Sequence, residues 1–132
     1  MHNEKPDMDD HPQPPSNPLK TKSYGFALRV IDLYKYLSQE KKEYVLSKQV
    51  LRSGTSIGAN VTEGNRAQSK SDFIHKLAIA LKEADETEYW INLLRDGCFV
   101  TEKAAISLLS DCCELQKMLV SSIKTAKRNL KD

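Results

Sequence analysis

Four acidic side chains fall within one short stretch of the sequence, at Glu83, Asp85, Glu86 and Glu88. Paired carboxylates serve acid–base catalysis or bind metal ions. A di-metal site inside a helical bundle uses inward-facing Glu-x-x-His pairs, and the sequence contains none. Glu83 and Glu86 are three residues apart and lie away from the apolar positions of their segment. This arrangement favours a solvated or intersubunit charged face over a catalytic site.

The cysteines and histidines do not form a pattern typical of a metal site. Cys98, Cys112 and Cys113 are odd in number and two are adjacent, which makes a poor disulfide framework. Zinc needs four ligands at suitable spacing, and His75 is the only histidine after residue 22. Cys112 falls on an apolar helix face, where we expect a small core residue. The sequence also lacks a phosphate-binding loop and a nucleophile elbow. We therefore expect no enzymatic activity, no metal and no cofactor.

Basic residues dominate the C-terminal segment, which has no acidic residue between positions 115 and 131. Its five cations are Lys117, Lys124, Lys127, Arg128 and Lys131. Three of them repeat every seven residues and so share one helix face. A helix dipole favours cations only in the last turn, whereas Lys117 lies about four turns from the end. The pattern is typical of a phosphate-binding stripe, with a plain solvated face as the alternative.

The total charge of the chain is less informative than its distribution. The net charge is +2, from 20 basic and 18 acidic residues, which is too balanced to indicate nucleic-acid binding by itself. Lys48 and Arg52, four residues apart, share a helix face and are candidates to extend the basic stripe.

The chain divides into an N-terminal arm and a helical domain. Residues 1–22 hold all five prolines and almost nothing apolar, so we expect a disordered arm. Residues 23–132 contain no proline and fit one domain. The sequence shows neither an apolar run of about 18 residues nor a signal-peptide core. We expect a soluble cytoplasmic protein without membrane contact.

Three helices follow from apolar spacings that alternate between three and four residues. One helix is predicted from a cap at Ser23 to about Ser38. Another begins at a cap at Ser71 and stops at Gly97. The third starts at a cap at Thr101 and continues to the basic C-terminal end.

Residues 45–64 are rich in serine, threonine and glycine, and propensity alone would favour a loop. Helical spacing nevertheless persists there, and Gly64 is a suitable stop. Gly54 and Gly58 would lie on one face and permit a close approach of a neighbouring helix. A helix here completes four amphipathic helices joined by short loops. The sequence therefore predicts an all-α, antiparallel up-and-down four-helix bundle.

Two further groups of residues are candidate sites. Ser53 and Asn60 lie on the apolar seam of 45–64, and Glu63 ends it. These side chains would form either a ligand pocket or a buried hydrogen-bond network that fixes helix register, with Ser56 as a partner. Tyr89, Trp90 and Leu93 make their helix apolar on more than one face, which predicts an oligomer interface. A core role for these aromatic residues is the alternative.

Two long motifs carry a family resemblance: LRSGTSIGANVTEGNRAQS (51–69) and DFIHKLAIALKEADETEYWINLL (72–94). Together with SYGFALRVIDLYKYL (23–37) they resemble the four-helix-bundle family named after proteins encoded in intervening sequences of bacterial 23S ribosomal RNA genes. The resemblance implies a bundle that assembles into a ring, commonly a homopentamer. The accessory protein of diversity-generating retroelements looks like a relative and is a basic pentameric barrel that binds nucleic acid and reverse transcriptase.

The leading hypothesis is a non-enzymatic, ring-forming bundle that binds RNA or DNA backbone through its C-terminal helix. The rival hypothesis is a protein-interaction or scaffold module that docks a partner through the Tyr89–Leu94 region and has no nucleic-acid role. Salt dependence separates the two, because phosphate binding weakens steeply as salt rises and hydrophobic docking does not.

Overall fold

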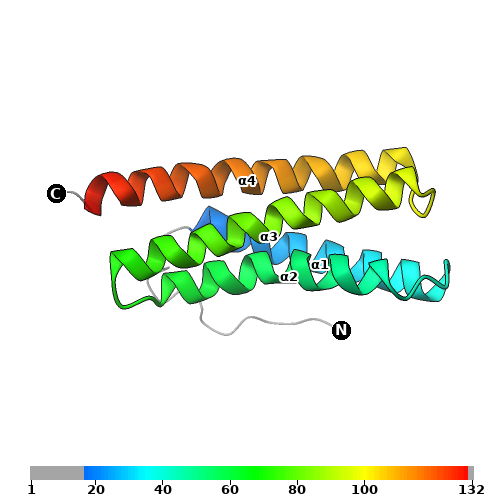
Figure 1. Ribbon diagram of the computed structural model, residues 1–132, viewed down its shortest axis with the longest axis horizontal. Coiled ribbons are helices and arrows are strands. Elements are labelled where there is room, and N and C mark those ends of the chain that lie inside the picture. Colours follow the sequence, from blue (N-terminus) through cyan, green and yellow to red (C-terminus); the bar gives the residue numbers. More distant parts are fainter. Residues whose placement is uncertain (1–16, 131–132) are drawn as a thin grey trace, which may run out of the picture.

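The computed structural model describes residues 17–130, which form four helices without any strand. These are α1 (Pro18–Gln39), α2 (Leu46–Asn65), α3 (Lys70–Asp96) and α4 (Glu102–Leu130). The helices run alternately in opposite directions and are joined by short turns (Figure 1). Each helix packs against its neighbours in chain order, and α4 returns to α1; in the diagonal pairs of these helices no two Cα atoms lie within 8 Å. The predicted up-and-down four-helix bundle is confirmed.

Helix α1 begins at Pro18, five residues before the predicted start. The side chain of Asn17 caps it by accepting a hydrogen bond from the Lys20 N–H at 3.1 Å. A proline in the first turn has no N–H to leave unsatisfied, so it starts this helix instead of preventing it. Ser23, the predicted cap, is buried inside the helix and donates to the carbonyl of Lys20. The predicted boundary after residue 22 therefore comes too late, and residues 1–16 of the predicted arm lie outside the described residues.

Helix α2 is continuous through the glycine-rich segment, as predicted from its spacing. A Cβ added at Gly54 would lie 2.7 Å from a methyl group of Val30 on α1, and one at Gly58 would lie 3.3 Å from the Ser23 hydroxyl oxygen. The predicted close approach of a neighbouring helix is therefore confirmed, and the neighbour is α1. The absence of two β-carbons lets the backbones approach.

The helix ends are set by local capping. Gly64 does not end α2 as predicted: it is buried inside the last turn, where a Cβ would lie 3.3 Å from the Cβ of Lys76 on α3. The cap of α3 is Ser69 instead of Ser71, and its hydroxyl accepts the Asp72 N–H at 3.0 Å. Gly97 does end α3, and the hydroxyl of Thr101 caps α4 as predicted.

A capping residue that the sequence analysis missed lies before α2. Partial burial disfavours the charged form of the Glu43 carboxylate, but hydrogen bonds from the backbone N–H groups of Leu46, Ser47 and Val45 outweigh it, so the pKa of Glu43 is lowered. The carboxylate therefore satisfies the donors that a helix start leaves without partners.

The core follows the predicted seams, and its largest buried side chains come from all four helices. They include Phe26, Val30, Leu37, Val50, Ile57, Leu77, Ile91, Leu94, Leu115 and Leu119. The interface between α1 and α4 is the smallest of the four interfaces between neighbouring helices, and ion pairs connect the two helices across it. Arg29 lies 2.7 Å from Asp111, and Lys22 lies 2.9 Å from Glu114. The C-terminal end of α4 extends past the start of α1 (Figure 1).

We predict that Gly54→Ala lowers the free energy of unfolding by about 1–3 kcal/mol, because its methyl group would overlap Val30. Gly25→Ala is the matched control, since a Cβ at Gly25 meets nothing within 4 Å. That substitution should stabilise α1 by about 0.5–1 kcal/mol through helix propensity. Urea unfolding at one fixed protein concentration measures both effects. An unchanged or raised midpoint for Gly54→Ala would contradict the prediction.

Candidate nucleic-acid interface

The C-terminal half of α4 presents four exposed cations, namely Lys117, Lys124, Lys127 and Arg128. We call these residues the basic face. None of them makes an ion pair with any residue between 17 and 130. Lys131, the fifth predicted cation, lies outside the described residues. The predicted clustering of the other four on one helix end is therefore present in the structure.

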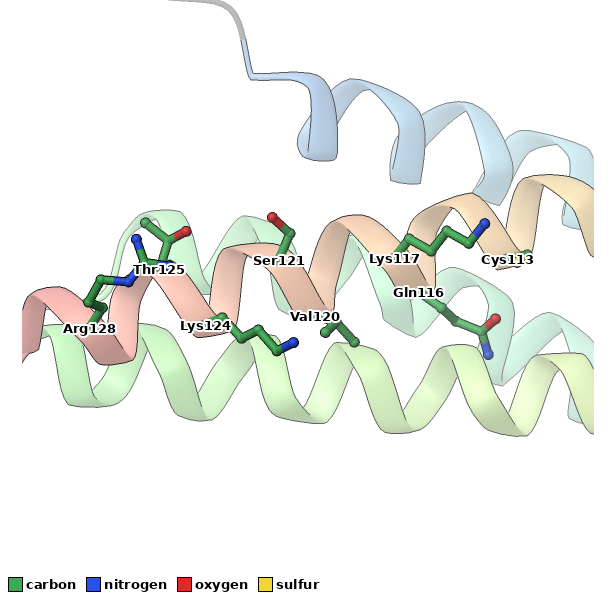
Figure 2. A pocket seen from close by; sticks show the side chains of 8 residues that line it. All are labelled: Cys113, Gln116, Lys117, Val120, Ser121, Lys124, Thr125 and Arg128. Carbon is green, nitrogen blue, oxygen red and sulfur yellow. The ribbon is translucent and has the colours of Figure 1, made fainter.

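A shallow groove runs along this part of α4, and Figure 2 shows Lys117, Lys124 and Arg128 distributed along its length. Between them the groove is lined by Cys113, Gln116, Val120, Ser121 and Thr125. Eleven residues separate Lys117 from Arg128, a helical rise of about 16 Å. One strand of a nucleic-acid duplex carries a phosphate about every 3.4 Å along its axis, so the groove matches about five phosphates.

Acidic side chains lie beside the basic face at its Gln116 end and are held by other groups. The amide of Gln116 donates to Asp85 and Glu88 of α3, each at 2.9 Å. Glu114 is engaged by Lys22, and its hydrogen bond is the main reason that the pKa of Lys22 is raised. These acids therefore stabilise helix packing and are not directed at the lysines of α4.

Lys48 and Arg52 do not extend the basic face, which corrects the prediction from sequence. Both are on α2, which lies diagonally opposite α4 among the four described helices, with no two of their Cα atoms within 8 Å. The guanidinium of Arg52 is also occupied, at 2.5 Å from Glu86 and 3.4 Å from Glu83 of α3. Its hydrogen bond lowers the pKa of Glu86. Spacing on one helix could not reveal which helix lies opposite.

The acidic cluster of α3 is divided between two sides of its helix. Asp85 and Glu88 face Gln116 of α4, whereas Glu83 and Glu86 face Arg52 of α2. The Glu83 Oε1 atom is buried without a hydrogen bond, and the nearby Arg52 charge compensates it. Among residues 17–130, no three histidine, cysteine, aspartate or glutamate side chains converge as metal ligands would.

The predicted polar core is only partly correct. Ser53 is fully buried, and its hydroxyl oxygen accepts a hydrogen bond from Thr87 of α3 at 2.8 Å. Thr87 keeps the apolar spacing of α3, so the sequence pattern does not reveal it as a polar partner. This hydroxyl pair joins α2 to α3 inside the core, where an unsatisfied group would be costly.

The other residues of that group are not in a shared network. Asn60 is half-buried and donates to the carbonyl of Ser56 in its own helix at 2.9 Å. The Ser56 hydroxyl likewise bonds the Arg52 carbonyl of α2. Glu63 is exposed and pairs with Lys76 at 2.9 Å. These contacts argue against a ligand pocket, because Asn60 and Ser56 find their partners in their own helix and Glu63 forms an exposed ion pair with α3.

The aromatic group of α3 is divided between core and surface. Trp90 is half-buried against the core, and its indole N–H donates to Glu86 at 3.3 Å. Tyr89 meets the Trp90 ring edge-on at 5.0 Å but is itself 58% exposed, and Leu93 is 38% exposed. Tyr89 and Leu93 are one turn apart and point away from the bundle. Two large apolar side chains thus remain on the surface of α3.

The cysteines differ sharply in environment. Cys112 is buried, with its sulfur 3.3 Å from the Ala84 carbonyl oxygen, and burial raises the pKa of its thiol to about 12. Cys98 and Cys113 are exposed, and Cys113 lines the groove of the basic face. The expected core role of Cys112 agrees with this burial. None of the described helices is long and apolar enough to cross a membrane.

A family model described as 23S rRNA-intervening sequence protein matches residues 17–121. This chain belongs to that family. The matched region covers the first three helices and most of α4, and of the basic face it includes Lys117 alone. The predicted resemblance is therefore confirmed, while most of the basic face lies past the matched residues. No curated protein matches the chain.

A solved relative supports the same fold. It is a protein with unknown function from the S23 ribosomal protein family of Bacteroides thetaiotaomicron, known from a crystal structure. The two chains are 55% identical, with a TM-score of 0.81, and the match covers 82% of this chain and 96% of the relative. The family and this relative fix the architecture but assign no activity.

We predict that Thr87→Val lowers the free energy of unfolding by about 1–2 kcal/mol, because it leaves the buried Ser53 hydroxyl without its donor. Thr55→Val is the matched control, since Thr55 is half-buried and bonds only carbonyl groups of its own helix. The double variant Ser53→Ala/Thr87→Val should lose less than the sum of its single variants. Additive losses in urea unfolding would show that the hydroxyl pair is not an energetic unit.

Proposed function

We propose that this protein is a non-enzymatic, ring-forming bundle that binds the backbone of RNA or DNA through the basic face of α4. The observation that carries the proposal is that this face gathers four cations without ion pairs to residues 17–130 on one helix end, where the sequence has no acidic residue from position 115 to 131. Lys22, Arg29, Arg52 and Lys76 each pair with an acid on a neighbouring helix. The cations of the basic face make no such pair with residues 17–130, so their charges are available to an anion.

Backbone binding fits the geometry better than base readout does. Three of the cations, Lys117, Lys124 and Arg128, line a shallow groove that has no aromatic side chain on which bases could stack. Phosphate contacts of this kind position a nucleic acid but do not distinguish its sequence. Each phosphate neutralised contributes about −0.9 to the slope of log K against log salt for duplex DNA.

Ring assembly would supply the number of cations that one chain lacks for tight binding. Four cations on one chain give weak binding at physiological salt, and linked copies gain through effective concentration. The family resemblance implies such a ring, and Tyr89 and Leu93 offer an exposed apolar surface that a second subunit could cover. In a closed ring, symmetry repeats the basic face once per subunit.

The second candidate function is a protein-interaction module without a nucleic-acid role. The same exposed Tyr89 and Leu93 support it, because an apolar surface of this kind also fits a partner protein. In that case the basic face would serve solubility only. The two functions differ in their response to salt.

The first test compares two variants with the same loss of charge. Replacing Lys117, Lys124, Lys127 and Arg128 with Gln should weaken binding of a fluorescent single-stranded RNA and a duplex DNA more than about tenfold at low salt, since these contacts would be lost. The control replaces Lys35, Lys42, Lys48 and Lys103 with Gln. These residues are exposed and lie toward the other end of the bundle.

Anisotropy titrations over a range of salt concentrations measure both variants. Wild type should bind with a steep salt slope, and the control variant should bind within a few-fold of wild type. Absence of wild-type binding at low salt, or an equal loss in the control, would contradict the proposal and favour the scaffold function.

The second test concerns assembly. Light scattering should give several times the 14.9 kDa chain mass, and Tyr89→Ser/Leu93→Ser should reduce it by removing exposed apolar area. Val45→Ser is the control, because Val45 is 70% exposed in the turn before α2. A wild-type protein that stays monomeric at high micromolar concentration would rule out the ring.

A further inference from the structure

The described chain begins beside the basic face. Asn17, Pro18 and Leu19, at the start of α1, line one pocket together with Lys117 and Ser121 of α4. Figure 1 likewise shows the start of α1 alongside the C-terminal half of α4. Whatever precedes Asn17 is therefore tethered at the edge of the groove that the basic face lines.

The tethered segment carries the opposite charge. Residues 1–16 contain Glu4, Asp7, Asp9 and Asp10 against the single cation Lys5, a net charge of −3 with neutral histidines. Because the whole chain has a net charge of +2, residues 17–132 carry +5. The segment attached next to the basic face thus has a net charge opposite in sign to that of the remaining chain.

The chain between Asp10 and Asn17 is long enough for the acidic side chains of residues 1–16 to contact the lysines of the basic face. Asp10 is seven residues from Asn17, and an extended chain of that length spans up to about 23 Å. The basic face from Lys117 to Arg128 extends about 16 Å. Attachment through a short linker also gives an effective concentration in about the millimolar range, so that weak ionic contacts suffice.

We propose that residues 1–16 bind the basic face of α4 in their own chain and compete there with nucleic-acid phosphates. The docking stands on tethering and charge, whereas the competition rests on the proposed function. The carboxylates of residues 1–16 pair with the lysines of the basic face at low salt. A polyanion displaces them when it brings more phosphates to these lysines than the segment brings carboxylates. The segment thus favours long nucleic acids over short anions, because a short anion cannot contact enough cations to displace it.

The exposed Cys113 provides a direct test of docking, because it lines the groove. A nitroxide spin label is attached to Cys113 in a Cys98→Ser background; the buried Cys112, with a thiol pKa of about 12, is not labelled. NMR then measures paramagnetic broadening of the amide signals of residues 1–16. The matched control neutralises the segment without shortening it, through Glu4→Gln, Asp7→Asn, Asp9→Asn and Asp10→Asn.

We expect strong broadening in wild type at low salt, and much weaker broadening in the neutralised variant and at about 0.5 M salt, where charges are screened within a few ångströms. A label on Cys98 in a Cys113→Ser background should leave these signals sharp. Equal broadening in wild type and the neutralised variant would overturn docking, since the tether alone would then explain it.

The second measurement is affinity for a fluorescent single-stranded 20-nucleotide DNA. If docking competes with phosphates, the neutralised variant should bind about 3- to 10-fold more tightly than wild type at low salt, and the difference should vanish at high salt. Charge-dependent broadening without DNA binding by either protein would retain docking and refute the proposed function. Equal DNA affinity together with charge-independent broadening would overturn docking and leave the proposed function standing.

Discussion

The close approach of α1 and α2 at Gly54 is the constraint on which the arrangement of the other helices depends. No side-chain atom fits between the Gly54 backbone and the methyl groups of Val30, so the two backbones approach as far as sterics allow. Close packing at a glycine recurs on both sides of α2, where Gly58 lies against Ser23 of α1 and Gly64 lies against Lys76 of α3. Helix α2 is thereby closely packed between α1 and α3, and the contact between α1 and α4 is left thinner.

This packing determines which side chains are available for function. Because α4 has only a small interface with α1, and no Cα atom of α4 lies within 8 Å of one in α2 among the described residues, much of α4 faces outward. Cations near an acid on a neighbouring helix form interhelical pairs, as Arg29 does with Asp111 and Arg52 with Glu86. The cations at the C-terminal end of α4 form no such pair with residues 17–130 and are exposed. The basic face therefore arises from helix order as well as from composition.

The sequence was sufficient to predict the elements, because apolar periodicity is a local property of each helix. It predicted α2 in spite of poor propensity, since the 4-3 spacing survives its glycines and serines. Prediction from the sequence failed where the role of a residue depends on a neighbouring helix. Arg52 is an exposed cation like Lys117, but Glu86 of α3 neutralises its charge. Asn60 looked like a register lock, whereas the interhelical bond is made by Ser53 and Thr87.

The predictions of where α1 and α3 begin were wrong for a different reason. Pro18 was counted with the prolines of the arm, although a proline in the first turn is compatible with a helix. Likewise, Ser69 and Ser71 both precede Asp72, and only the backbone at Ser69 has the extended conformation that a cap requires. Two serines of equal propensity cannot be separated by pattern alone, because the choice depends on where the preceding turn places the chain.

Family membership settles the bundle and leaves the function to local chemistry. The matched residues end at 121, before Lys124, Lys127 and Arg128, so the family model does not itself account for these cations. Residues 1–16, which have a net negative charge, also precede the match. Both charged segments therefore lie outside the matched residues, one before residue 17 and the other after residue 121. If the proposed ring forms, each subunit would contribute one basic face and one acidic segment. Under the two proposals, assembly would then raise the avidity for a long polyanion and leave the competition against short anions unchanged.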